Sequence, residues 1–224
     1  MSRPLRLAVF DVDGTLVDSQ HHINGAMQQT FGAQELICPP LEQVRGIIGL
    51  SLPVAMRQLS PDLADAQYDA LVEGYKNCFK SNRDAGQNAP LYSGITQLLD
   101  KLAQDEELLL GLATGKSRRG LDAMLDGHGM ARRFVTAQVA DDHPSKPHPA
   151  MLFAALMETG TEAANSVMIG DTTFDMQMGQ AAGMGCIGVS WGYHPVDDLR
   201  QAGASHIVDN TVELLELLMG YWGK

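Results

Sequence analysis

The stretch AVFDVDGTLVDS, residues 8–19, ends an apolar run abruptly in two aspartates that stand one residue apart. A short apolar run of this kind is typical of a buried β-strand. Side chains two residues apart on an extended chain point to the same side, so Asp11 and Asp13 would present two carboxylates to one small volume. These carboxylates repel each other unless a cation or a proton lies between them. The stretch therefore predicts a strand that ends in a charged site.

Four more short apolar runs follow the first one, and amphipathic segments separate them. The five predicted strands cover residues 5–10, 108–113, 135–139, 167–170 and 186–189. Strands that alternate with helices predict an α/β fold in which a parallel, Rossmann-like sheet is covered on both faces.

Roughly a hundred residues separate the first two strands, far more than one crossover helix needs. Apolar residues recur at helical spacing over residues 62–79, and residues 22–31 are a second candidate helix. The inserted segment is therefore predicted to be all-helical, and Ser93 is the predicted N-cap of the helix that follows it. The expected division gives residues 1–15 and 93–224 to the sheet domain and residues 16–92 to the helical domain.

Composition excludes several classes of partner. The chain has 224 residues, of which 45% are hydrophobic and 19% charged, which is typical of one to two packed globular domains. Lys and Arg number 16 against 27 Asp and Glu, which gives a net charge of −11. Such a surface repels phosphate backbones and anionic lipid heads, so we expect neither a nucleic-acid partner nor a membrane partner.

Cysteine usage and the N-terminal sequence indicate the compartment. The three cysteines, Cys38, Cys78 and Cys186, are odd in number, widely spaced and without a CxxC pair, which disfavours a disulfide framework and a zinc site. The N-terminal residues lack the apolar length of a signal peptide, and no apolar run approaches the ~18 residues of a membrane span. We expect a cytoplasmic protein, and the sequence leaves a monomer and a homodimer both open.

Polar clusters follow the predicted strands directly. Thr114-Gly115-Lys116 comes after the second strand, Lys146-Pro147 lies some residues past the third, and the segment from Asp171 to Asp175 comes after the fourth. Ligands of parallel α/β sheets bind at the carboxyl ends of the strands, so these clusters are expected to converge with Asp11 and Asp13 at one edge.

The converging groups have the chemistry of a phosphoryl site. Clustered carboxylates need a hard divalent cation with oxygen ligands, most naturally Mg²⁺. Lys146 adds positive charge and Thr114 can donate a hydroxyl hydrogen bond. A helix that starts near residues 115–117 would hold an anion with its free N–H groups.

In this order the motifs resemble those of the haloacid dehalogenase superfamily of phosphohydrolases. The resemblance rests on DxDGTLxDS at residues 11–19, Thr114 after an apolar strand, Lys146-Pro147, and GDTxxD at residues 170–175. It spans essentially the whole chain, and the helical insertion resembles the mobile cap of the first type in that family. The resemblance implies an α/β core of that family's type beneath a helical cap.

The resemblance also implies roles for the residues that match the motifs. Asp11 would be the nucleophile that forms an aspartyl phosphate, and Asp13 would be the general acid for the leaving alcohol and then the base for water. Thr114, Gly115 and Lys146 would bind the phosphoryl oxygens. Phosphoryl transfer depends mainly on positioning and charge neutralisation, which these groups supply.

The implied metal site uses the remaining aspartates. Asp171 would bind Mg²⁺ together with Asp11 and the backbone carbonyl of Asp13. Asp175 would support the site by orienting Lys146 or the waters of the metal.

Arg45 is a candidate specificity residue in the predicted cap. It lies in a loop whose Gly46 and Gly49 allow bending, and its guanidinium could bind a second anionic group of the substrate. An ordinary surface arginine is the alternative interpretation.

Within the family, the opening motif, the cap size and the KPHP run are most similar to those of phosphoglycolate phosphatases. We therefore expect a Mg²⁺-dependent phosphomonoester hydrolase that acts on a small phosphate ester. Gly115 stands where such phosphatases often carry asparagine, which leaves other small phosphomonoesters, a sugar-phosphate mutase and a pyrophosphatase open. A non-catalytic phospho-aspartate switch is a less favoured alternative, because such a module needs neither Asp13 as a proton-transfer group nor the helical insertion.

Overall fold

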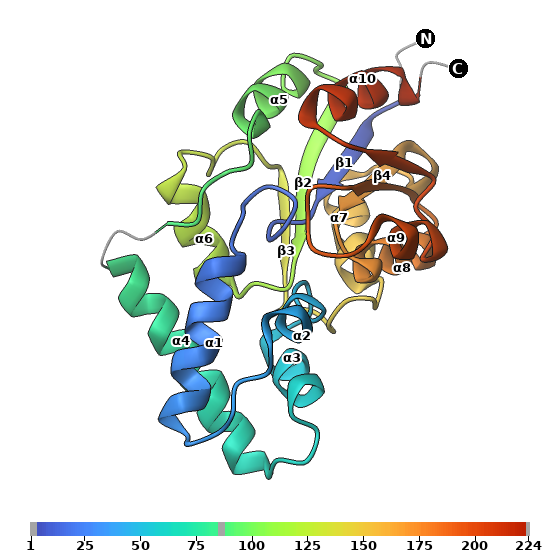
Figure 1. Cartoon of the computed structure of the whole chain (residues 1–224). Helices are drawn as coiled ribbons and strands as arrows, with labels where there is room; N and C mark the ends of the chain where they lie inside the picture. The colour runs from blue at the N-terminus through green and yellow to red at the C-terminus, as the bar shows by residue number, and fades with distance from the viewer. Residues whose placement is uncertain (1–3, 85–87, 223–224) are drawn as a thin grey trace.

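The computed structural model of the protein describes residues 4–84 and 88–222, and its centre is a parallel sheet (Figure 1). Six strands lie in the order β3-β2-β1-β4-β5-β6. The strands are β1 Arg6–Phe10, β2 Leu108–Thr114, β3 Thr136–Val139, β4 Ser166–Gly170, β5 Gly185–Val189 and β6 His206–Val208. Each strand pairs in parallel with its neighbours, which confirms the predicted fold class.

Five of the described helices lie between β1 and β2: a first group of four, then α5 just before β2; the other helices connect or follow the later strands. The first group is α1 Gln20–Ala33, α2 Leu41–Arg45, α3 Leu52–Leu59 and α4 Asp65–Asp84. The second group is α5 Ile95–Leu102, α6 Arg118–Gly127, α7 Ala150–Thr159, α8 Thr173–Ala181, α9 Val196–Gln201 and α10 Thr211–Tyr221, with a short 3₁₀ turn at Ala163–Asn165.

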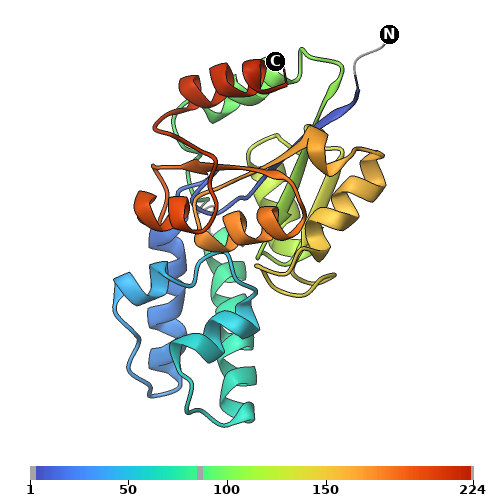
Figure 2. The ribbon, with the colours of Figure 1, turned by 90° about the vertical axis from the view of Figure 1, so that its right-hand side faces the viewer.

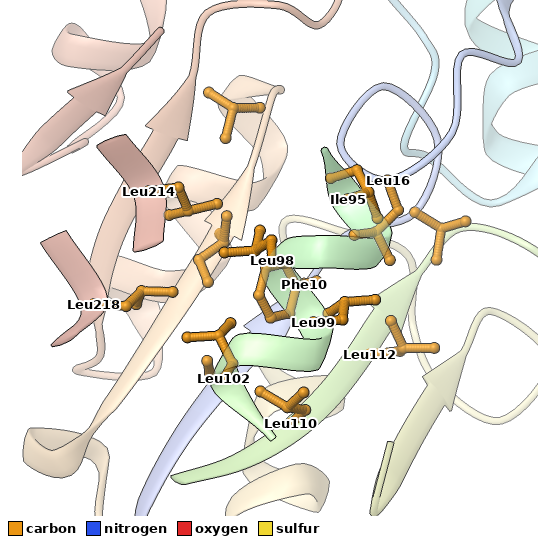
Figure 3. Packing of buried hydrophobic residues seen from close by; sticks show 14 of the residues in the cluster. Phe10, Leu16, Ile95, Leu98, Leu99, Leu102, Leu110, Leu112, Leu214 and Leu218 are labelled. Carbon is orange, nitrogen blue, oxygen red and sulfur yellow. The ribbon is translucent and has the colours of Figure 1, made fainter. Parts of the chain in front are cut away.

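Successive side chains of β1 point to opposite faces of the sheet, and a separate layer of the hydrophobic core lies on each face. Ala8 and Phe10 face one side of the sheet and pack with residues of α5, α6 and α10, whereas Leu7 and Val9 face the other side and pack with residues of α7 and α8. Figure 3 shows Phe10 among leucines of α5 and β2. Leu7 to Phe10 are fully buried on both faces of the sheet, which explains why β1 is apolar from Leu7 up to the aspartates.

Two local expectations were wrong. The sixth strand, β6, was not predicted, because it has three residues and begins with the exposed His206, so no apolar run marks it. The N-cap of α5 is Gly94 and not Ser93. Gly94 has a φ of 81°, and the carbonyl of Ser93 instead accepts a hydrogen bond from the Thr211 hydroxyl.

The helices α1–α4 gather at one end of the molecule, away from α5 and α10 (Figures 1 and 2). They enclose a hydrophobic cluster of their own, which includes Met27, Phe31, Met56 and Leu71. The division into domains at residues 15 and 93 stays a prediction.

The two connections between these helices and the sheet run side by side. Val17 and Leu91 form an antiparallel bridge. The amide of Asp18 donates to the carbonyl of Pro90 at 2.9 Å, and the amide of Tyr92 donates to that of Leu16 at 3.0 Å. The chain therefore leaves and re-enters the sheet region at one place.

Candidate active site

The polar residues predicted from the sequence lie at the carboxyl edge of neighbouring strands. Asp11 directly follows β1, Thr114 is the last residue of β2, and Asp171 directly follows β4. Since β1 pairs with both β2 and β4, the three side chains start from adjacent positions. Lys146 reaches the same place from the loop between β3 and α7.

Lys146 joins two of the carboxylates. Its Nζ lies 2.6 Å from Asp11 Oδ1 and 2.6 Å from Asp175 Oδ1, and the lysine side chain is fully buried. Burial disfavours the ammonium, but the two carboxylates outweigh it and raise the pKa of Lys146. Desolvation raises the pKa of Asp11 to about 7, although Lys146 opposes the shift.

Asp171 is held by hydrogen bonds to both oxygens. Oδ1 accepts from the Thr15 hydroxyl at 2.9 Å, and Oδ2 accepts from the amide of Tyr193 at 2.9 Å. Desolvation, followed by the charges of Asp11 and Asp175, raises the pKa of Asp171. Gly14 presses against this carboxylate, because a Cβ there would lie 2.1 Å from Asp171 Oδ2. Its φ of 90° is a second reason for glycine at that position.

The three buried carboxylates fit a divalent cation. Oxygens of Asp11, Asp171 and Asp175 lie within 4.8 Å of one another, and Lys146 is the ammonium that contacts two of them. Asp11 Oδ2 is buried and has no hydrogen-bond partner among the described residues. Asp175 is less available, since the Lys146 ammonium pairs with its Oδ1 and both the amide and the hydroxyl of Thr172 donate to its Oδ2, whereas each oxygen of Asp171 accepts a single bond from a neutral donor. The donor set therefore suits a hard cation held by Asp11 and Asp171.

Asp13 points to a different set of partners. Its Oδ1 accepts from the Ser19 hydroxyl at 2.5 Å and forms an ion pair with Lys116 Nζ at 2.8 Å. The hydroxyl of Tyr193 in turn accepts from the amide of Ser19 at 3.0 Å. Asp13 lines a cavity and Lys116 lines it as well, so this carboxylate faces open space.

The loop after β2 touches the helical segment. Thr114 is buried, and its hydroxyl accepts from the amide of Lys116 at 3.2 Å. A Cβ on Gly115 would lie 2.4 Å from the carbonyl oxygen of Leu50. The helix start expected near residues 115–117 lies at the end of that range, since Ser117 is the N-cap of α6 and Arg118 its first residue; the Ser117 hydroxyl already accepts from the amide of Gly120.

Comparison with known proteins agrees with this geometry. The family model described as haloacid dehalogenase-like hydrolase matches residues 8–189, which include the three strand ends and Lys146. The chain belongs to this family. The probable phosphatase IndB of Dickeya dadantii is 34% identical over 212 residues, which cover 93% of this chain and 91% of that protein.

Two further proteins similar to this hydrolase support the same family and fold. A phosphoglycolate phosphatase of Pseudomonas syringae pv. syringae is 29% identical over 214 residues, covering 94% of this chain and 78% of that protein. A hydrolase from Pseudomonas syringae of known structure has a TM-score of 0.85 at 24% identity, with coverage of 96% and 98%, and shows the fold alone. The predicted enzyme class, a phosphatase of the haloacid dehalogenase family, is confirmed.

The cavity beside Asp13 has a volume of about 540 Å³. It lies between the helical segment and the loop after β2 with α6, so both parts of the hydrolase contribute to it. Its lining combines apolar residues of α1, α4 and the segment before α3 with polar residues of the loop and α6. Gly115 of the predicted site lines this cavity.

Arg45 is not brought to the other predicted residues. It is the last residue of α2, its Nε lies 2.9 Å from Gln20 Oε1, and its Nη2 binds the same oxygen. It does not line the cavity as the structure describes it. A role in substrate binding therefore stays a prediction.

Two groups near the site were not singled out from the sequence. Lys116 was seen only as part of a polar cluster and received no role, although it pairs with Asp13. The segment after β5 also went unnoticed: Trp191 Nε1 donates to the carbonyl of Thr15 at 3.1 Å, and Tyr193 contacts both Asp171 and Ser19. For Lys116, the sequence signal is its position two residues after the end of a strand. The segment that carries Trp191 and Tyr193 offers no sequence signal beyond its glycine and its aromatic residues.

Within the described residues, the helices are all too short or too polar to cross a lipid bilayer.

Proposed function

We propose that this chain is a Mg²⁺-dependent phosphomonoester hydrolase that acts on a small phosphorylated metabolite through an aspartyl phosphate on Asp11. The observation that carries the proposal is the state of Asp11, which is buried, bound to Lys146 through Oδ1 and without a hydrogen-bond partner at Oδ2 among the described residues. A carboxylate held in this way has one oxygen fixed in position and one available, as a positioned nucleophile requires.

The first half of the reaction forms a covalent intermediate. A carboxylate oxygen of Asp11 attacks phosphorus in line, and the bond between phosphorus and the ester oxygen breaks. Asp13, which faces the cavity, donates a proton to the departing alcohol oxygen. Lys146 and Thr114, together with the amide of Gly115, bind the phosphoryl oxygens and neutralise part of their charge.

The second half reverses the role of Asp13. The carboxylate accepts a proton from water as the water oxygen attacks phosphorus, and the bond to Asp11 breaks to release phosphate. Asp175 acts through Lys146, because its Oδ1 holds Nζ at 2.6 Å while Asp11 Oδ1 binds the same atom. Mg²⁺ held by Asp11 and Asp171 would offset the negative charge of the phosphoryl group and of the carboxylates.

The experiment that tests the proposal is steady-state phosphate release from a panel of small phosphomonoesters, with Mg²⁺ and then with a chelator. The relative named phosphoglycolate phosphatase makes phosphoglycolate the first ester to include. Metal-dependent release is the expected result. No release from any ester, together with stable labelling of Asp11 by acetyl phosphate, would contradict the proposal and favour a phospho-aspartate switch. A cytoplasmic location is proposed together with this metabolic role.

A further inference from the structure

The cavity beside Asp13 is large for a two-carbon alcohol. Cavities of about 300–1,000 Å³ typically bury most of the surface of a drug-sized ligand, and this one measures about 540 Å³. If phosphorus is bound at Asp11, the leaving alcohol extends past Asp13 into this space. The lining residues therefore report the chemistry of the alcohol.

An aromatic wall stands next to Asp13. Tyr75 and Phe79 lie one turn apart on α4, and their ring centroids are 4.8 Å apart. Lys116 Nζ lies 5.9 Å from the centroid of Phe79 and 2.8 Å from Asp13 Oδ1. Burial and then the charge of Asp13 raise the pKa of Tyr75, which places that ring near the same carboxylate. An alcohol that leaves beside Asp13 would contact these rings first.

The rest of the wall is also apolar over much of its area. The surface continues from the two rings over apolar residues of the segment before α1, of α1, of the segment before α3 and of α6. Among them are Val17, Ile23, Met27, Ile47, Leu50 and Met124. Methionine side chains adapt their shape to a ligand, and apolar walls favour an alcohol that buries apolar area. A small polyhydroxylated or glycolate-like alcohol would leave these walls without a partner.

Positive charge lies at the exposed part of the same cavity. Lys76 and Lys80 of α4 and Arg119 of α6 line it and are exposed, whereas Asp141 is the exposed acidic residue of the described lining. Glu73 holds Lys76 at 2.8 Å, so we assign the binding of a second anionic group to Lys80 of α4 and Arg119 of α6. The exposed lining of the cavity thus carries an excess of positive charge, opposite in sign to the net charge of the whole chain, which is −11. It indicates a ligand with a negative group distant from the reacting phosphate.

We infer that the substrate is a phosphomonoester whose alcohol places an apolar, ring-bearing body against Tyr75 and Phe79 and a second negatively charged group at Lys80 and Arg119. The inference rests on the proposed function and narrows it, since it excludes phosphoglycolate as the preferred ester.

Three esters test the inference when they are compared at one Mg²⁺ concentration. They are phosphoglycolate, phenyl phosphate, and phenyl phosphate that carries a propanoate group para to the ester oxygen. The expected order of kcat/KM rises in that sequence, by about tenfold at each step. A preference for phosphoglycolate, or equal values for the two aryl esters, would overturn the inference and leave the proposed function intact. No metal-dependent phosphate release from any ester would overturn both.

Variants separate the two parts of the cavity. Phe79→Ala should lower kcat/KM for phenyl phosphate about tenfold more than for phosphoglycolate, and Phe79→Leu should recover much of that loss. The double variant Lys80→Ala with Arg119→Ala should lower kcat/KM for the propanoate ester about tenfold more than for phenyl phosphate. Because Lys80 and Arg119 are exposed, their replacement spares the core, so the test stands even if Phe79→Ala does not fold. Arg132→Ala, an exposed cation outside the described lining, is the matched control. Equal losses for the paired esters would contradict the assignment.

Discussion

The carboxylate cluster at the strand ends and the cavity beside it are built in different ways. In the cluster, Asp171 accepts two hydrogen bonds at 2.9 Å, one from a hydroxyl and one from a backbone amide. Lys146 donates two hydrogen bonds at 2.6 Å, each to a carboxylate. The cavity wall instead consists largely of side chains without directional contacts, such as Met27 and Met124. Directional contacts fix the reacting groups, whereas the wall can change its shape. Substitutions in the cluster should therefore act on every substrate, and those at the cavity should act on some substrates more than on others.

Asp11→Asn should produce the largest effect. The amide is a poor nucleophile, so kcat should fall by at least about 10³-fold for every ester, with little change in the circular dichroism spectrum. Phosphate release measured against a panel of esters checks this. A residual rate above one tenth of the original would contradict the nucleophile assignment.

Lys146→Met should destabilise the fold as well as abolish turnover. It removes the ammonium from between two buried carboxylates, and breaking a buried pair in this way typically costs about 3–5 kcal/mol. Urea unfolding followed by circular dichroism measures the loss. Added Mg²⁺ should restore part of the stability, because the cation replaces positive charge that the variant lacks. Lys101→Met, at an exposed lysine of α5, is the control.

The stability of the metal-free protein should depend on pH through Asp11. The folded protein raises the pKa of this carboxyl from 3.8 to about 7, so the folded state binds the proton more tightly than the unfolded chain does. The resulting stability is complete below about pH 4 and is lost as the pH rises through about 7. With a chelator present, the Tm of the wild type between pH 5 and pH 8 should fall at least about 3 °C more than that of Asp11→Asn. Equal slopes for the two proteins would contradict the shift.

Gly115→Ala should affect the contact between the two regions. Its new Cβ would lie 2.4 Å from the Leu50 carbonyl oxygen and 2.6 Å from that of Gly49, so backbone must move. We expect kcat/KM to fall about tenfold for all esters while Tm changes by less than about 3 °C, because the contact is at the edge of the core. Gly220→Ala in α10, where a Cβ would meet nothing within 4 Å, is the matched control. An unchanged kcat/KM would show that this contact is dispensable in catalysis.

Arg45→Ala should have the smallest effect. The guanidinium is bound to Gln20 outside the described lining of the cavity, and it would have to leave that partner to reach a substrate. We expect KM for a carboxylated ester to rise by less than about threefold and KM for phenyl phosphate to stay the same. A tenfold rise confined to the carboxylated ester would instead place Arg45 in the binding site.

The sequence predicts the cluster better than the cavity, for a topological reason. Asp11, Asp171 and Thr114 end strands that are adjacent in a parallel sheet, so their convergence follows from strand order once the apolar runs are identified. The pairing of Lys116 with Asp13 depends on side-chain direction within a loop, which no periodicity reports. Tyr193 reaches Ser19 from a segment 174 residues away, and the sequence gives no register for that contact.

The same limit applies to the fold. β1 could be predicted because both of its faces are buried and its sequence is therefore apolar from Leu7 to Phe10. β6 is a three-residue strand at the edge of the sheet, and it is held in the extended conformation by its pairing with β5 and not by a pattern in its own sequence. The orientation of Arg45 toward Gln20 is decided by how α2 packs on α1, which is a tertiary contact.

The antiparallel bridge between Val17 and Leu91 has a consequence for how such a protein can change over evolutionary time. The ends of the segment between them meet at this one bridge and its two backbone hydrogen bonds, so the sheet places no requirement on how long that segment is. A shorter or longer insertion could be exchanged there without altering strand order or moving Asp11, and the phosphoryl chemistry could be inherited unchanged by a lineage that acquires a different substrate.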